Sequence, residues 1–172
     1  MSDPETTTMV ISALERAVNR LNLVVHQIAM AVLFLMMILT TGDVLGRRLF
    51  SPIPGTFELT ELGMVILVFF SMGYTQVRKG HVNIDLIVAK FSTRVQALFD
   101  AVTYLIMLVL LVLVTWQLFA HANRLLATNN VTGVLGIPLY PIALLGAVGN
   151  IIFCLAVVVD LGKSVVKAVQ NK

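Results

Sequence analysis

Twenty consecutive residues, Ala101 to Ala120, carry no charged side chain. A helix of this length rises about 30 Å, the thickness of the hydrocarbon layer of a bilayer. Tyr104 near one end and Trp116 near the other suit the aromatic belts of membrane interfaces. The segment therefore predicts a membrane-spanning helix, and it limits the chain to folds built around one.

The rest of the 172-residue chain has the same character. It is 58% hydrophobic and 12% charged, whereas a soluble domain is roughly half apolar and a quarter charged. Apolar runs predict spans at about 21–50, 57–78 and 134–159, besides the one at about 95–120. We expect an all-α integral membrane protein with four transmembrane helices in a single membrane domain, residues 1–172.

Two amphipathic segments are expected at the membrane surface. Residues 6–20 gather apolar side chains on one face, opposite Glu15, Arg16 and Arg20, which predicts an N-terminal interfacial helix or, alternatively, an arm that docks on a partner. Residues 82–94 mix apolar and charged side chains and predict a short interfacial helix between spans 2 and 3.

Prolines and polar residues mark two connections. Residues 51–55 (Ser-Pro-Ile-Pro-Gly) end the first span, and Thr56 is expected to cap the next helix. Residues 121–133 are polar and predict a second exposed connection. Pro138 and Pro141 allow a kink or a late start in the fourth span.

The end of the first span carries two candidate contacts. Gly42 and Gly46 form a G-x-x-x-G pattern that would let another helix approach closely, either in this chain or in a partner. Asp43 and Arg47 lie four residues apart and are expected to pair, while Arg48 points elsewhere.

The middle of each span lacks reactive chemistry. No acid, base or histidine lies at the centre of any of the four, although an autonomous carrier needs such a group or internal repeats with broken helices. Asn150 is the one strongly polar residue near mid-depth and is interpreted as a helix-to-helix contact. We expect neither an enzyme nor a cofactor, and the basic residues form no stripe typical of nucleic-acid binding. The lone Cys154 excludes an internal disulfide.

Histidine ligation of haem is the alternative from another functional class. His26, near one end of the first span, and His81, just after the second, could lie at similar depth on neighbouring helices. The chain would then be a haem- or quinone-linked membrane anchor of a respiratory complex. His121 lies on the opposite side of the membrane in this scheme.

The stretch from Gly42 to Asp85 resembles a known family, the small DctQ-type membrane subunit of tripartite ATP-independent periplasmic (TRAP) transporters. The matching features are Arg47 or Arg48 near the end of the first span, a Pro-x-x-G-x-x-E loop that ends at Glu58, the run E-L-T-E-L, and Gly80-His81-Val82 followed by Asp85. Chain length and four spans agree as well.

The resemblance implies an accessory subunit that braces a larger membrane subunit and carries no substrate site itself. The large subunit would move substrate, and a periplasmic binding protein would deliver it. The transporter would import organic acids, of the C4-dicarboxylate or sialic-acid class, with a sodium gradient, across the bacterial inner membrane. Membrane lipid is the remaining expected partner.

Within this family, the charged residues at the periplasmic edge become candidates for an interface. We hypothesise that Glu58 and Glu61 form a cluster with Arg47 and Arg48, which fixes the first two helices, faces the large subunit or receives the binding protein; solvated charges at helix ends are the alternative. Arg78, Lys79 and His81 are expected to anchor the cytoplasmic side.

The distribution of basic residues predicts the orientation. Nine lie on one side of the four-span scheme and three on the other: Arg16, Arg20, Arg78, Lys79, Lys90, Arg94, Lys163, Lys167 and Lys172 against Arg47, Arg48 and Arg124. Because cytoplasmic segments are enriched in Lys and Arg, both termini should be cytoplasmic. A reporter that is active only in the cytoplasm should give signal when fused after Lys172, and a silent fusion would refute the four-span scheme.

Overall fold

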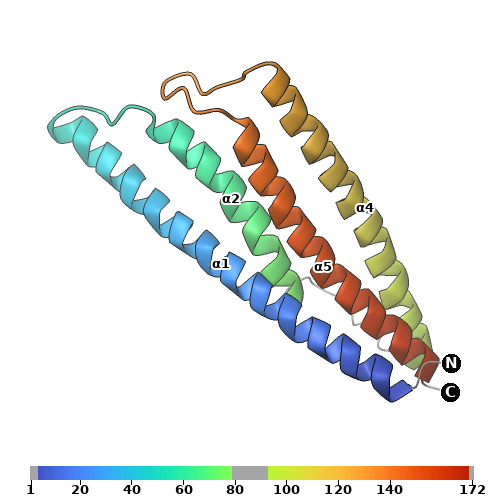
Figure 1. Ribbon diagram of the computed structural model, residues 1–172. Coiled ribbons are helices and arrows are strands. Elements are labelled where there is room, and N and C mark those ends of the chain that lie inside the picture. The colour runs from blue at the N-terminus through green and yellow to red at the C-terminus, as the bar shows by residue number, and fades with distance from the viewer. Residues whose placement is uncertain (1–3, 79–92, 171–172) are drawn as a thin grey trace.

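The computed structural model describes residues 4–78 and 93–170, and four long helices account for most of them (Figure 1). They are α1 (Pro4–Leu49), α2 (Thr56–Val77), α4 (Thr93–Ala127) and α5 (Tyr140–Gln170). Each contains a segment long and apolar enough to cross a membrane: Ala13–Leu49, Thr56–Val77, Leu98–Ala127 and Tyr140–Val166. The predicted all-α fold with four spanning helices is confirmed.

Helix α5 holds the other helices together. It packs against α1, α2 and α4, whereas α4 packs chiefly on α5 and diverges from α2 toward the loop end (Figure 1). The start of α1 and the end of α5 lie together at one end of the molecule, and the connections 50–55 and 128–139 lie at the other. In a bilayer crossed by all four helices, Pro4 and Gln170 would lie on the same side.

Small residues let α2 come close to α5. A Cβ atom added at Gly149 would lie 2.8 Å from Phe70 Cδ1 and 3.0 Å from the backbone carbon of Phe69. A Cβ atom at Gly146 would lie 3.3 Å from Phe69 Cδ2. Within a bilayer, lipid tails are as apolar as leucine, so close backbone packing of this kind is what holds helices together.

Helices α1 and α2 meet in the same way. Gly73 on α2 faces the side-chain oxygen of Asn22 on α1, which would collide with any Cβ at position 73. Asn22 is 1% exposed, and its amide nitrogen donates to the Val18 carbonyl oxygen (2.9 Å). Val25 and Ala29 continue the buried stripe of α1 toward Phe70, so the contact with α2 extends along one face of α1.

The N-terminal segment differs from its predicted form as a separate interfacial helix. No glycine, and no proline after Pro4, occurs before Gly42, and α1 runs unbroken from Pro4 to Leu49. Val18 is buried against Ala156 and Val159 of α5, so this part of α1 packs on the helix bundle. The interfacial helix expected at 82–94 lies almost wholly outside the described residues.

Two predicted boundaries near the second connection were wrong. Helix α4 continues to Ala127, since nothing between His121 and Ala127 interrupts its backbone hydrogen bonds, and Asn129 then leaves the helix with a φ of 47°. Helix α5 begins at Tyr140 and not near Val134, because residues 128–139 form a compact turn closed by a bridge between Val131 and Pro138. The late start that Pro138 and Pro141 allowed is the one observed.

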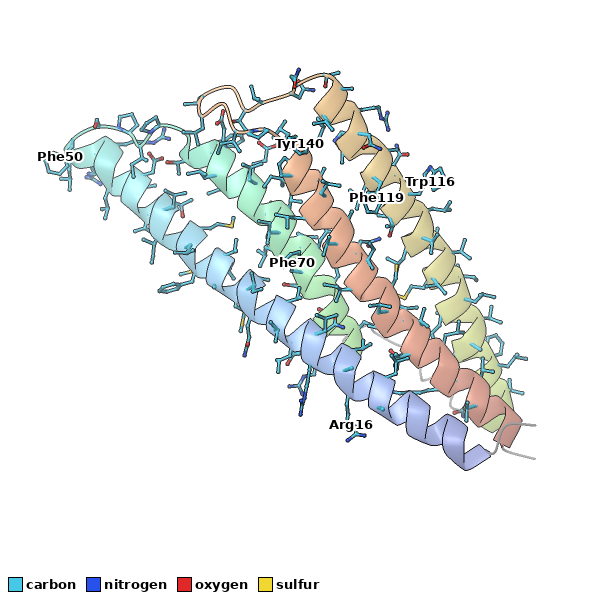
Figure 2. All side chains as sticks on the ribbon, viewed as in Figure 1. Arg16, Phe50, Phe70, Trp116, Phe119 and Tyr140 are labelled. Atoms are coloured by element: carbon cyan, nitrogen blue, oxygen red, sulfur yellow. The ribbon has the colours of Figure 1, made fainter. Side chains whose placement is uncertain are left out.

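The outer surface of α4 is apolar and unpacked. None of its most apolar 18-residue window is buried, and Trp116 is 76% exposed and points away from the other helices (Figure 2). In α5, by contrast, 56% of the corresponding window is buried. A surface of this kind is stable only against lipid or against another membrane protein.

The close contact of α2 with α5 makes a prediction about stability. Gly149→Ala should lower the free energy of unfolding by about 1–3 kcal/mol, because the new methyl group meets the backbone of Phe69 and forces the helices apart. The measurement is thermal or denaturant unfolding in mild detergent. Gly162→Ala is the matched control, since nothing lies within 4 Å of a Cβ there. Equal stabilities of the two variants would contradict this packing.

Candidate functional site

The loop end of the molecule is built by contacts between its two connections. Gly55, with a φ of 79°, occupies the N-cap position of α2, and the side chain of Leu135 lies against it with no room for a Cβ. Thr56 was expected to be this cap, which was wrong: its hydroxyl donates to the Ile53 carbonyl oxygen (3.0 Å). The glycine is required by both the backbone conformation and the contact.

Asp43 ties the end of α1 to the first connection. Its carboxylate Oδ2 accepts from Arg47 Nε (2.8 Å) and forms a 2.7 Å ion pair with Arg47 Nη2, while Oδ1 accepts from the Ile53 N–H (2.8 Å). Asp43 is 5% exposed, although the Arg47 side chain is 61% exposed. The Asp43–Arg47 pair is as predicted, and the bond to Ile53 adds a tie between helix and loop that the sequence did not reveal.

The two glycines beside Asp43 serve the same loop. A Cβ at Gly46 would lie 2.8 Å from the Ser51 carbonyl oxygen, and one at Gly42 would lie 3.8 Å from Ile53 Cδ1. No atom of another helix in the described part of the chain comes within 4 Å of either position. Within this chain, Gly46 therefore makes room for a returning loop, the distance at Gly42 is an ordinary contact, and neither glycine faces another helix.

Glu58 ties α2 to the second connection. One carboxylate oxygen accepts from the Val134 N–H (2.6 Å) and the other from the Leu135 N–H (2.9 Å). Two backbone amides that would otherwise need water near the membrane edge are thus satisfied by a side chain 76 and 77 residues away in sequence. Asp43 and Glu58 thus each accept backbone N–H groups, Asp43 from the first connection and Glu58 from the second.

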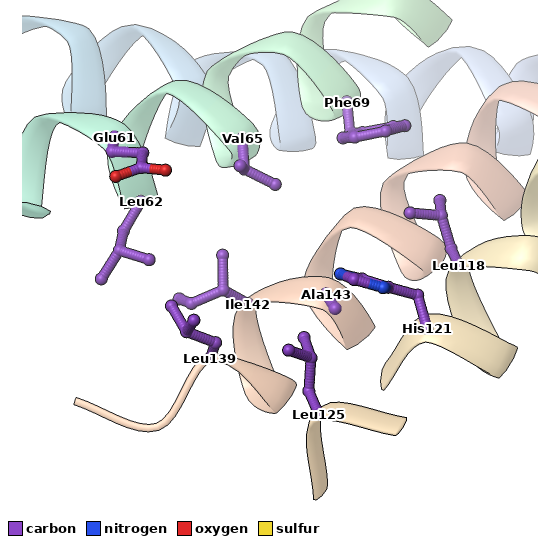
Figure 3. Close-up of a pocket in the computed structure, with 10 residues that line it drawn as sticks. All are labelled: Glu61, Leu62, Val65, Phe69, Leu118, His121, Leu125, Leu139, Ile142 and Ala143. Carbon is purple, nitrogen blue, oxygen red and sulfur yellow. The ribbon is translucent and has the colours of Figure 1, made fainter. Parts of the chain in front are cut away.

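The four charged residues proposed as one cluster are separated. Arg47 pairs with Asp43 and Glu58 bonds to the second connection, and among the described residues no ion pair joins Glu58 or Glu61 to Arg47 or Arg48. Glu61 faces a crevice between α2 and α4 (Figure 3), and Arg48 is exposed. Arg48 and Glu61 are thus the members of the set that this chain leaves available to other molecules.

Asn150 joins α5 to α4 at mid-depth, as interpreted from the sequence. Its side-chain nitrogen donates to the Leu111 carbonyl oxygen (2.9 Å) and to Thr115 Oγ1 (2.7 Å), and the residue is 2% exposed. A buried amide in apolar surroundings is costly unless it is bonded, so these contacts fix the register of the two helices.

A second set of polar ties, which sequence reasoning missed, lies at the end near the termini. Gln76 Nε2 on α2 donates to Asp160 Oδ2 on α5 (2.8 Å), and Lys163 Nζ pairs with Glu15 Oε1 on α1 (2.5 Å) and more distantly with Asp160 Oδ1 (3.8 Å). These partners are up to 148 positions apart, so no local pattern could have found them.

The residues proposed for haem or for cytoplasmic anchoring are placed only in part. His26 stacks on Tyr74, with ring centroids 4.2 Å apart. Arg78 donates from Nε to the hydroxyl of Tyr74 (2.9 Å). Lys79, Gly80, His81 and Asp85 lie outside the described residues. In the part of the chain that the structure describes, no three His, Cys, Asp or Glu side chains come together as a metal site.

These features define a class: a four-span membrane protein whose polar side chains join helix ends and loops, with uncharged span centres. Comparison with family models gives the narrower answer. Residues 36–166, most of the chain, match the DctQ component of tripartite ATP-independent periplasmic transporters, and the chain belongs to this family. It is a small TRAP transporter subunit and not an enzyme; the family works with a large membrane subunit and a periplasmic binding protein. Neither the curated proteins nor the solved structures gave a match.

The two bonds to Glu58 predict a local change on mutation. Glu58→Ala should speed hydrogen exchange at the Val134 and Leu135 amides by about tenfold, because both donors lose a charged acceptor. Exchange read out by mass spectrometry on the 128–139 connection measures it. Asp100→Ala, which removes an exposed carboxylate from the other end of α4, is the control. Unchanged exchange in Glu58→Ala would contradict the tie.

Proposed function

We propose that this chain is a static brace for the large membrane subunit of a sodium-coupled importer of organic acids. The observation that carries the proposal is the position of its charges. The segments 27–42, 62–77, 101–120 and 140–159 contain no Asp, Glu, Lys, Arg or His, so the chain offers no charged side chain or histidine in mid-membrane for an ion or an anionic substrate. Coupling and substrate sites then belong to the partner.

Rigidity at both ends supports a bracing role. Asp43 and Glu58 fix the two connections at one end, and the Gln76–Asp160 and Glu15–Lys163 contacts join α1, α2 and α5 at the other. If the helices of this subunit moved against one another during transport, these four contacts would have to break in each cycle. A subunit that stays fixed beside a moving partner retains all four contacts.

The exposed apolar length of α4 supports a stable complex in the membrane. Its side chains have no partner helix on the outer side among the described residues, and Leu113 and Trp116 are 60% and 76% exposed. We propose a lasting pair with the large subunit, surrounded by lipid, and brief contact with the periplasmic binding protein at the loop end. Arg48 is an exposed charge there with no ion-pair partner among the described residues.

The orientation and substrate complete the proposal. The excess of Lys and Arg on the side of the termini supports cytoplasmic termini in the bacterial inner membrane, with the Asp43 and Glu58 loops in the periplasm. The family resemblance supports a C4-dicarboxylate or sialic acid as cargo, with a sodium gradient as the driving force.

The alternative function, a membrane anchor of a respiratory complex, is not favoured by any observation, since the family assignment points to transport.

The first test is purification of the tagged chain from its native membrane in mild detergent, with a visible spectrum of the sample. A larger multi-span protein in equal amount and a colourless sample are the expected result. A haem absorption band with redox subunits in place of that protein would overturn the proposal.

A transport assay tests the finer claim. Cells that express all three components should take up labelled C4-dicarboxylate or sialic acid only with an inward sodium gradient, and uptake should fall to background when this chain is deleted. Re-expression of the wild-type chain is the control for the deletion. Full uptake without the chain, or uptake that ignores sodium, would refute the brace or the coupling respectively.

A further inference from the structure

A crevice of about 280 Å³ lies between α2 and α4, with the start of α5 as its floor (Figure 3). It exists because α4 rests on α5 and diverges from α2 at this end. Ile142 and Ala143 line it from α5, Leu139 from the connection just before α5, Val65 from α2 and Leu118 from α4. The lining is apolar except for Glu61 on one wall and His121 on the other.

Glu61 and His121 make no polar contact within the described part of this chain. Asp43, Glu58 and Asp160 each accept hydrogen bonds from other elements or side chains, whereas Glu61 has no hydrogen-bond or ion-pair partner among the described residues, and neither has His121. Both side chains are exposed at the crevice. A carboxylate one to two turns inside a membrane-spanning helix is unfavourable without a partner, so the partner comes from outside the chain.

We propose that the crevice binds one ethanolamine-type phospholipid, with the ammonium on Glu61, the phosphodiester on His121 and part of an acyl chain on the apolar floor. An ionised carboxylate only accepts hydrogen bonds and matches the ammonium group. An imidazole has at least one N–H in either protonation state and matches a phosphate oxygen. The two walls therefore complement the two charges of a zwitterionic headgroup. The site belongs to the chain's own three helices and does not depend on the transport role.

The shape of the crevice favours a hydrocarbon chain over a helix of a partner subunit. The crevice lies between two helices of this chain, whereas a helix with its side chains is about 10 Å wide. A single hydrocarbon chain is far narrower. A lone basic side chain from a partner would satisfy Glu61 but leave His121 without a partner.

The position along the helices fits a headgroup. Glu61 is five residues from the start of α2 and His121 six residues from the end of α4, so each lies about 8–9 Å from its helix end. The apolar lining continues from these two residues toward the membrane centre, at Val65, Phe69 and Leu118. Polar groups at the edge and apolar groups below them follow the order of headgroup and tail in a bilayer.

The test is lipid titration followed by native mass spectrometry, on the full chain purified with its large membrane subunit. The probes are dioleoyl phosphatidylethanolamine and dioleoyl phosphatidylcholine, whose methylated ammonium cannot donate a hydrogen bond. Glu61→Gln should weaken the tightest phosphatidylethanolamine site by about fivefold, the size expected for a charge-assisted hydrogen bond at a partly solvated site. His121→Ala should also weaken it, and phosphatidylcholine should bind the wild type no better than phosphatidylethanolamine binds Glu61→Gln.

Two further variants locate the effect. Asp100→Asn removes an exposed carboxylate from the opposite end of α4 and should leave lipid affinity unchanged. Ala143→Leu fills the floor of the crevice without changing its charge and should expel the lipid. Equal affinities in Glu61→Gln and Asp100→Asn, or equal affinities of the wild type for the two lipids, would overturn the proposal. Loss of the large subunit from Glu61→Gln with lipid binding intact would also overturn it, and would assign Glu61 to a basic group of that subunit.

Discussion

Close approach to α5 is the constraint on which the rest of the structure depends. No hydrophobic effect drives helices together within lipid, so packing and hydrogen bonds must do so. Gly146 and Gly149 allow α2 to approach, and Asn150 bonds α4 at Leu111 and Thr115. Helix α4 depends on this second contact most, because it packs chiefly on α5.

Two carboxylate side chains hold the loops in place by accepting hydrogen bonds from their backbone N–H groups. A loop at a membrane edge has backbone N–H groups that neither a helix nor bulk water reliably satisfies. Asp43 accepts one such N–H from Ile53, and Glu58 accepts two, from Val134 and Leu135. The acids that were proposed for an interface thus shape the two loops, and Arg48 is left exposed beside them.

The sequence predicted what depends on local pattern. Apolar length located four spans, and a spacing of four residues predicted the Asp43–Arg47 pair. The predicted helix boundaries were wrong where tertiary contacts decide them. Val131 pairs with Pro138, so α5 begins only at Tyr140, and Gly55 occupies the N-cap position that was expected for Thr56. The Gly42 and Gly46 pattern is ambiguous in sequence, since a loop and a helix both use the space beside a glycine. The Glu58 and Gln76 contacts join distant segments, so no pattern within a helix could reveal them.

Helix α1 is longer than a membrane is thick, so it lies partly in lipid and partly outside it. Its 46 residues rise about 69 Å, whereas a helix tilted by 40° needs only about 39 Å to cross a 30 Å hydrocarbon layer. Much of α1 therefore lies in the interface or in water. A contact such as the Glu15–Lys163 ion pair, near that end of the helix, is screened by salt, whereas the packing of Val25 and Ala29 on Phe70 within lipid is not. One continuous helix thus takes part in two assemblies with different dependence on ionic strength.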